Sequence, residues 1–238
     1  MMHSDICQAY LWENKGTPLV FLIPGGAGTR RRTMPGYPAM AGFFWLHGWS
    51  VYIAATAGQD GQPGVFSMKD CLDECVAKFD TLVPRLSPNS IVLFGACSGG
   101  TIATHLAAAQ PVDTLVIWET LPRYDRSFIQ AWKAKTGAEV AFSDGFLEEC
   151  LDTVDSAGDV KAHVVNLYGR LPSKTHYLSD DDVQSFKNGF GSAASFTSRG
   201  FEGADHNLPR GTNPRLLNDV LTVIISQLGS AEELEKPR

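Results

Sequence analysis

The segment Gly95-x-Cys97-x-Gly99 is the part of this sequence that most directly indicates chemistry. It follows an apolar run, residues 91–94, and precedes a stretch of small residues, 101–110, so we expect the cysteine at a sharp strand-to-helix turn. Side chains two positions before and after the cysteine would collide there, which explains both glycines. The turn would lift the sulfur clear of the sheet at a helix N-terminus, where partial positive charge favours the thiolate. The expected chemistry is nucleophilic attack on a carbonyl carbon.

Strands and helices alternate along the chain from residue 19 to residue 118. Short, continuously apolar runs predict strands buried on both faces of a parallel sheet, and a helical spacing of apolar residues predicts the helices between them. Ser67 with Asp70 three residues later predicts a helix start. Strands are predicted at 6–12, 19–23, 51–55, 91–94, 115–118, 164–168 and 196–201, and helices at 40–47, from Ser67 to Pro88, and at 101–110, 181–187 and 214–228.

This alternation predicts an α/β fold with a mostly parallel sheet flanked by helices. Residues 121–160 break the pattern with two short helical stretches, which we interpret as a small helical cap over the carboxyl edge of the sheet. The length of 238 residues fits one domain, so residues 1–238 are expected to form a single α/β unit with this cap inserted.

The composition is that of an ordinary globular protein, with 44% hydrophobic and 19% charged residues. A net charge of −6 argues against general nucleic-acid binding. No apolar run approaches the roughly 20 residues of a membrane helix. The first residues resemble no signal peptide, so we expect a cytoplasmic protein. The five cysteines suit neither a disulfide framework nor a metal site, and neither a metal nor another cofactor is predicted.

The chain resembles the α/β-hydrolase superfamily over nearly its whole length. The resemblance is carried by the cysteine motif, by the strand and helix order, and by the loop Pro24-Gly25-Gly26-Ala27-Gly28 after an early strand. It implies an oxyanion hole made of two backbone N–H groups. One belongs to Ser98, directly after the nucleophile, and the other to Gly26 in the glycine loop.

The same resemblance implies the chain order nucleophile, acid, histidine. Of the histidines after Cys97, His206 lies in Gly203-Ala204-Asp205-His206-Asn207, which follows the predicted strand ending at residue 201. This position matches the histidine loop of the family, so His206 is the expected general base. His163 opens a strand and His176 lies in a loop, and neither position fits.

The acid departs from the usual pattern of the family. It commonly follows the strand that corresponds to residues 164–168, but no carboxylate occurs there in Gly169-Arg170-Leu171-Pro172-Ser173. A minority of members carry the acid one strand earlier, and Glu119 occupies that position here. Asp180 is an alternative, although helix capping explains it as well. A Cys–His pair without any acid is the remaining possibility.

The cysteine in the nucleophile position limits the families, and so the substrate classes, that the chain resembles. Size and motif are similar to those of dienelactone hydrolase, and a cysteine with an early acid resembles Dieckmann cyclases and thioesterases of natural-product assembly lines. The leading expectation is hydrolysis of an activated ester, lactone or thioester through an acyl-cysteine. One alternative is acyl-thioester cyclisation or acyl transfer in natural-product biosynthesis. Another is a ligand-binding protein without turnover.

The expected partner is a small-molecule acyl substrate, either free or carried on an acyl carrier protein or coenzyme A. Arg30 begins a run of three arginines after the glycine loop and could hold a carboxylate or a phosphopantetheine arm, although a solvated basic turn is the alternative. Trp118, directly before Glu119, could line the substrate pocket, unless the pleat of the strand turns it away. The sequence leaves the oligomeric state open.

Overall fold

The computed structural model of the chain describes residues 10–25, 36–55, 58, 64–124, 127, 130–131, 134, 150–170, 178–206, 208 and 213–227. Their central element is a seven-stranded sheet in the order β1-β3-β2-β4-β5-β6-β7. The strands are β1 (Tyr10–Trp12), β2 (Leu19–Ile23), β3 (Ser50–Ile53), β4 (Ile91–Ala96), β5 (Thr114–Trp118), β6 (His163–Gly169) and β7 (Ser195–Phe201). Strand β1 runs antiparallel to β3 and all other neighbours are parallel, which confirms the predicted sheet.

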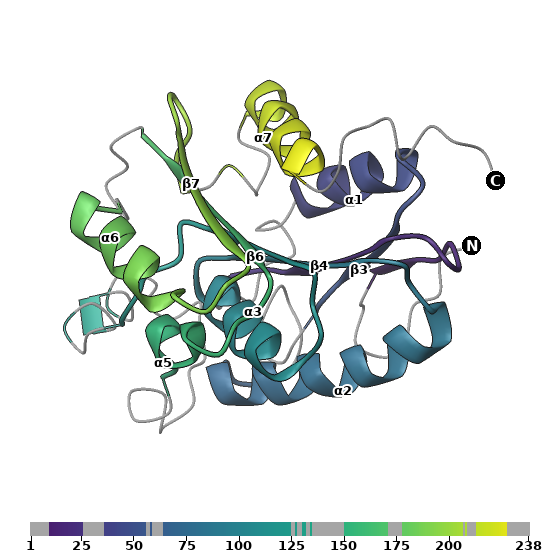
Figure 1. Ribbon diagram of the computed structural model, residues 1–238, viewed down its shortest axis with the longest axis horizontal. Coiled ribbons are helices and arrows are strands. Elements are labelled where there is room, and N and C mark those ends of the chain that lie inside the picture. Colours follow the sequence, from purple (N-terminus) through teal and green to yellow (C-terminus); the bar gives the residue numbers. More distant parts are fainter. Residues whose placement is uncertain are drawn as a thin grey trace.

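Helices cover both faces of the sheet (Figure 1). One face carries α1 (Gly36–Leu46) and α7 (Pro214–Gln227), and the other carries α2 (Met68–Leu86) and α3 (Ser98–Ala109). The shorter helices α5 (Thr153–Ala157) and α6 (Asp180–Gly189) lie on the α3 side. We call these two sides the α7 face and the α3 face.

Strand β2 shows why the buried strands lack polar alternation. Leu19, Phe21 and Ile23 join the apolar cluster of the α3 face, whereas Val20 and Leu22 join the cluster of the α7 face. Successive side chains of a strand point to opposite faces, so a strand covered on both sides needs apolar residues at every position. All five residues of β2 are buried.

Two helix starts illustrate how local sequence sets the element bounds. The Ser67 side chain accepts a 3.2 Å hydrogen bond from the Asp70 N–H, which confirms the predicted start of α2. Helix α1 begins at Gly36, earlier than the predicted residue 40. The prediction was late because Gly36 and Pro38 suggest a break, but a proline in the first turn costs no hydrogen bond.

The carboxyl ends of the parallel strands meet at one edge of the sheet. Strand β4 pairs with β5 up to Ala96 and Trp118, and β5 pairs with β6 up to Trp118 and Leu167. The residues that follow these strand ends are therefore neighbours in space. The predicted cap at 121–160 stays a prediction, since most of residues 125–149 lie outside the described part of the chain, but α5 from this region packs against α3.

Candidate active site

Cys97 occupies a strained turn between β4 and α3. Its backbone angles are φ 53° and ψ −127°, in a region that side-chain-bearing residues rarely adopt. The Cys97 N–H donates a 2.9 Å hydrogen bond to the Trp118 carbonyl oxygen, which ties the turn to the end of β5. The side chain remains partly exposed. Strain held in place by surrounding structure is typical of functional positions.

The two glycines of the motif are required by close backbone contacts. A Cβ atom on Gly95 would lie 2.5 Å from the Gly100 Cα, and one on Gly99 would lie 2.7 Å from the Pro24 carbonyl oxygen. Both distances are far shorter than van der Waals contact. The sequence Gly-x-Cys-x-Gly is therefore a condition for this turn to form against β2.

The loop after β2 reaches the cysteine. A Cβ atom on Gly25 would lie 2.6 Å from the Cβ of Cys97, so this loop starts in contact with the nucleophile. Gly26 and Arg30 lie outside the described residues, and their predicted roles stay predictions. Ser98 is the buried first residue of α3. Amides of the first helical turn point toward the N-terminal end, which is where Cys97 lies.

Glu119 follows β5 and is held rigidly. Its φ of 47° is left-handed, and its side chain is buried. The Glu119 N–H donates to the Leu167 carbonyl oxygen at 3.0 Å, and the Gly169 N–H donates to Glu119 Oε1 at 2.6 Å. Backbone and carboxylate are thus both fixed by β6, the strand after which the acid of the family commonly occurs.

The second carboxylate oxygen of Glu119 faces the histidine. Glu119 Oε2 lies 3.8 Å from His206 Nδ1, an ion-pair distance, and both side chains are largely buried. Gly169 makes this approach possible, because a Cβ atom there would lie 2.6 Å from the Ala204 carbonyl carbon and 3.0 Å from the Asp205 nitrogen. The glycine at the end of β6 therefore anchors the acid and admits the loop that carries His206.

His206 interacts with both Cys97 and Glu119. Burial is the largest influence on its pKa and lowers it, but the charge of Cys97, a hydrogen bond with Cys97 and the Glu119 carboxylate outweigh burial and raise the pKa to about 9. An imidazolium is thus favoured when the sulfur beside it is a thiolate. The site can hold a thiolate–imidazolium ion pair backed by a carboxylate.

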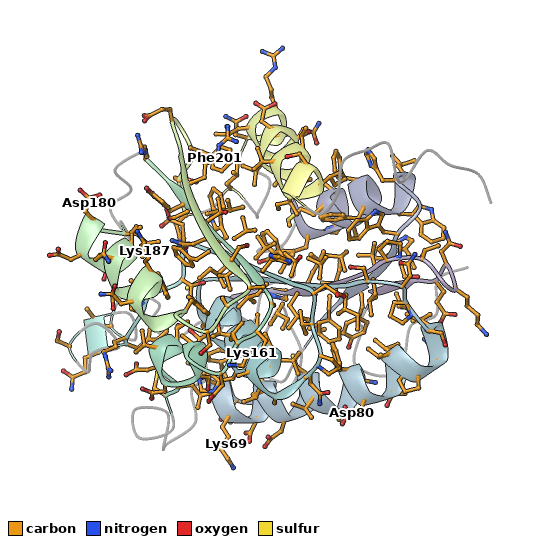
Figure 2. The ribbon with its side chains drawn as sticks, viewed as in Figure 1. Lys69, Asp80, Lys161, Asp180, Lys187 and Phe201 are labelled. Carbon is orange, nitrogen blue, oxygen red and sulfur yellow. The ribbon has the colours of Figure 1, made fainter. Side chains whose placement is uncertain are left out.

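The other candidate acids and bases lie elsewhere. Asp180 is exposed in the first turn of α6, at the periphery of the molecule (Figure 2). The capping box of that helix is made by Ser179 and Asp182, not by Asp180. His163 is exposed, and its Nδ1 lies 2.9 Å from Ser195 Oγ. His176 falls outside the described residues.

Trp118 contributes to the site through its backbone. Its carbonyl oxygen holds the Cys97 turn, whereas its ring is fully buried on the α7 face, with the centroid 6.2 Å from that of Phe201. The pleat of β5 thus directs this ring into the core. A contact of the ring with substrate stays a prediction.

Tyr124 lies near Cys97 and was not anticipated from the sequence. Burial, and after it the charge of Cys97, raise its pKa well above the usual value near 10. Its hydroxyl oxygen lies 3.5 Å from Thr101 Oγ1 of α3. No motif marks Tyr124, because its position depends on the path of the chain after β5.

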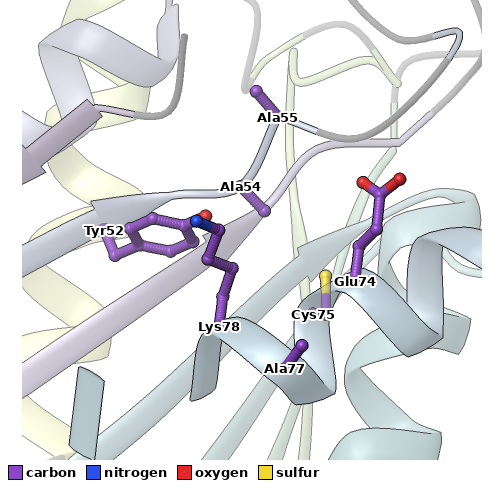
Figure 3. A pocket seen from close by; sticks show the side chains of 7 residues that line it. All are labelled: Tyr52, Ala54, Ala55, Glu74, Cys75, Ala77 and Lys78. Carbon is purple, nitrogen blue, oxygen red and sulfur yellow. The ribbon is translucent and has the colours of Figure 1, made fainter. Parts of the chain in front are cut away.

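A cavity of about 230 Å³ lies between the end of β3 and helix α2 (Figure 3). It is lined by Tyr52, Ala54, Ala55, Glu74, Cys75, Ala77 and Lys78. None of the three residues at the Cys97 site lines it, and β2 lies between β3 and β4 in the sheet. We therefore treat it as separate from that site.

Within the described residues, no group of three or more His, Cys, Asp and Glu side chains could hold a metal ion. No helix in that part of the chain is long and apolar enough to cross a membrane.

No protein-family model and no curated protein matches the sequence. Solved structures do. Est1E from Butyrivibrio proteoclasticus has a TM-score of 0.66 at 14% identity, covering 92% of this chain and 93% of that one. The thioesterase domain from the curacin biosynthetic pathway has a TM-score of 0.57 at 16% identity, over 90% and 94%. The monoacylglycerol lipase of Paleococcus ferrophilus has a TM-score of 0.63 at 16% identity, over 92% and 97%. The chain therefore has the α/β-hydrolase fold.

Proposed function

We propose that this protein is a cysteine-dependent acyl hydrolase that acts on activated esters, lactones or thioesters. The observation that carries the proposal is the contact of His206 with both Cys97 and Glu119 at the carboxyl edge of the sheet. The nucleophile contacts the base, and the base contacts an orienting carboxylate. Acyl-transfer enzymes use this arrangement of contacts on several unrelated folds.

Acylation starts from the thiolate–imidazolium pair. The Cys97 sulfur attacks the acyl carbonyl carbon, and the carbonyl electron pair moves onto oxygen. The amide of Ser98, together with that of Gly26, stabilises this oxyanion. Collapse re-forms the carbonyl and breaks the bond to the leaving group, which takes the proton of His206. A thioester on Cys97 and a neutral imidazole remain.

Deacylation reverses these roles. The neutral imidazole of His206 takes a proton from water, and the resulting hydroxide attacks the thioester carbon. Collapse of the second oxyanion releases the carboxylic acid and restores the Cys97 thiolate beside the imidazolium. Glu119 holds the ring orientation and stabilises its charged form in both half-reactions.

Acyl transfer or cyclisation with the same residues is the second candidate function. The observation that favours it is the cysteine itself, since an acyl-cysteine passes its acyl group to carbon or nitrogen nucleophiles more readily than an acyl-serine does. A thioesterase domain from a biosynthetic pathway is among the structural neighbours, which is compatible with a thioester as the acyl donor. In this second proposal Arg30 would hold the phosphopantetheine arm of a carrier-bound acyl group.

The proposal is tested by measuring turnover of three kinds of substrate: acyl thioesters of N-acetylcysteamine, a p-nitrophenyl ester and a γ-lactone. Each substrate is offered to the wild type, to Cys97→Ala and to Cys150→Ala. Cys150 is a matched control, because it is also partly exposed but burial, and after it the charge of Asp152, raise its pKa to about 12. We expect Cys97→Ala alone to abolish turnover. Free acid as product indicates hydrolysis, and a cyclic or transferred product indicates the second function. No turnover of any substrate by the wild type would contradict both and favour a binding protein.

A further inference from the structure

Thr120, the residue directly after the acid, packs against the first turn of the nucleophile helix. Its side chain is fully buried. A Cβ atom on Gly100 would overlap Thr120 Oγ1, and it would lie 2.9 Å from the Thr120 Cβ atom and 3.0 Å from its Cγ2 atom. Gly100 lies three residues after Cys97, and its N–H donates to the Cys97 carbonyl oxygen at 2.9 Å. Thr120 thus occupies the space that a side chain at position 100 would need.

This contact depends on the place of the acid in the sheet. Strand β5 is the direct neighbour of β4, the strand that leads to Cys97, whereas β6 is one strand further away. The residue that follows an acid at the end of β5 can therefore reach the start of α3. The contact also explains why a second glycine, Gly100, follows the Gly-x-Cys-x-Gly turn in this sequence.

The backbone at Glu119 needs support from its surroundings. Its φ of 47° is left-handed, which is unfavourable for a residue with a side chain and persists only where neighbouring contacts hold it. The Glu119 N–H donates to the Leu167 carbonyl oxygen at 3.0 Å, and the next residue, Thr120, is packed against α3. The turn that carries the acid is therefore fixed to β6 through one residue and to the nucleophile helix through the next.

One carbonyl oxygen joins the turn of the acid to the turn of the nucleophile. The Trp118 carbonyl oxygen accepts a 2.9 Å hydrogen bond from the Cys97 N–H and a longer one, at 3.5 Å, from the Thr120 hydroxyl. The hydroxyl oxygen also suits the close approach to Gly100, because oxygen tolerates a Cα–H group at a shorter distance than a methyl group does. Thr120 is thus connected to the nucleophile turn by a hydrogen bond and by packing.

We propose that Thr120 is a positioning residue that holds Glu119 at a fixed place relative to Cys97, so that the carboxylate meets the imidazole of His206. This assignment rests on the proposed acyl-enzyme function and adds a residue that acts through the acid. Glu119 Oε2 lies 3.8 Å from His206 Nδ1, and an interaction at this distance is sensitive to small displacements of the carboxylate. Fixing the Glu119 turn against α3 therefore affects the ring that serves the nucleophile.

The test compares Thr120→Val and Thr120→Ser with the wild type on the thioester of N-acetylcysteamine that the wild type turns over best. Valine keeps the shape of threonine but replaces the hydroxyl with a methyl group, which cannot donate to Trp118 and is too large for the close approach to Gly100. We expect Thr120→Val to lower kcat about 10-fold or more and to change KM less than about twofold. Thr120→Ser keeps the hydroxyl and should retain kcat within about threefold.

The pH profile gives a readout that a merely structural role would not move. The Glu119 carboxylate is one cause of the raised pKa of His206, so a displaced carboxylate should move the basic limb of kcat/KM to lower pH in Thr120→Val. Thr114→Val is the matched control, because Thr114 is also buried but lies at the opposite end of β5. It should leave both kcat and the basic limb unchanged.

A double-mutant cycle tests whether Thr120 acts through the acid. In the Glu119→Gln background, Thr120→Val should lower kcat by less than about a further twofold, because the carboxylate that it would displace is already gone. Equal losses from Thr120→Val in both backgrounds, or no loss in the wild-type background, would overturn this assignment and leave the acyl hydrolase proposal intact. Failure of the wild type to turn over any thioester would overturn the proposed function itself, and the assignment with it. If Thr120→Val does not fold, Thr120→Ala, which removes atoms and adds none, takes its place in the same cycle with the same expected results.

Discussion

The backbone N–H of Gly169 donates a 2.6 Å hydrogen bond to Glu119 Oε1, joining the end of β6 to the residue that follows β5. The sequence has no acidic residue directly after β6, where the family commonly has one. Gly169 at the end of β6 instead binds the carboxylate of Glu119, which follows the neighbouring strand β5. The same glycine leaves room for the backbone of Ala204 and Asp205, which brings His206 to the other carboxylate oxygen. One residue without a side chain thus sets the geometry of both partners.

Gly169→Ala should therefore impair the site and the fold together. The added Cβ would lie 3.0 Å or less from the backbone of Ala204 and Asp205, so the loop must move and take His206 with it. We expect kcat/KM to fall more than about 10-fold and the free energy of unfolding to drop by about 1–3 kcal/mol. Urea unfolding and steady-state kinetics measure the two effects. Gly42→Ala is the control, because nothing lies within 4 Å of a Cβ added at that position in α1, and it should lose neither activity nor stability.

Glu119→Gln should lower turnover with little change in fold. The amide oxygen can still accept from Gly169, but the charge that stabilises the His206 imidazolium is gone. We expect kcat to fall about 100- to 10,000-fold, as for other exchanges of an orienting carboxylate. Asp180→Asn, at an exposed helix start, should leave kcat unchanged. An inactive Asp180→Asn beside an active Glu119→Gln would reverse the assignment of the acid.

The pH profile should report the raised pKa of His206. Acylation needs the imidazolium as proton donor, so kcat/KM for a thioester should be maintained at neutral pH and fall as the pH rises through about 9. The carboxylate is one cause of the raised pKa, so the basic limb of Glu119→Gln should move to lower pH. Stopped assays from pH 6 to 10.5 measure the basic limb of the wild type and that of Glu119→Gln. A basic limb that is unchanged in Glu119→Gln would show that the two residues are not coupled.

Cys97→Ser should be nearly inactive despite its similar shape. A hydroxyl is a far weaker acid than a thiol, so the resting ion pair with His206 does not form. We expect a loss of at least about 100-fold in kcat/KM for thioesters, since nucleophile activation by an ion pair is removed. Cys150→Ser should keep activity within about twofold, because that thiol has a pKa of about 12 and donates to Met68 Sδ at 3.5 Å. Equal activity of Cys97→Ser and wild type would show that the thiolate is not required.

Much of the fold could be predicted from the sequence because its signals are local. The apolar runs that became β2, β4 and β5 are short and uninterrupted, and each is bounded by turn residues. The start of α1 was less predictable because glycine and proline occur in its first turn. Pro38 costs no hydrogen bond there, since the N–H groups of a first turn have no partner within the helix. Pro84 lies inside the last turns of α2, where the packing of the buried side of the helix outweighs the local preference.

Only part of the candidate site could be predicted from the sequence. Cys97 could be named because its turn requires particular residues, and His206 and Glu119 because the chain order of a known family suggested them. The structure brings these three together, but the positions of Gly169 and Tyr124 beside them depend on contacts between segments far apart in the sequence. No periodicity or motif encodes such contacts, since either residue would suit an ordinary loop.

The most direct test of the central claim is the rate at which iodoacetamide modifies Cys97 at pH 7, followed by peptide mapping in the folded and urea-unfolded protein. If Cys97 is held as a thiolate beside the His206 imidazolium, it should react about 10-fold faster or more in the folded chain, and His206→Ala should remove this advantage. Reaction of folded Cys97 at or below the rate of the unfolded chain, or a rate unaffected by His206→Ala, would contradict the proposed nucleophile.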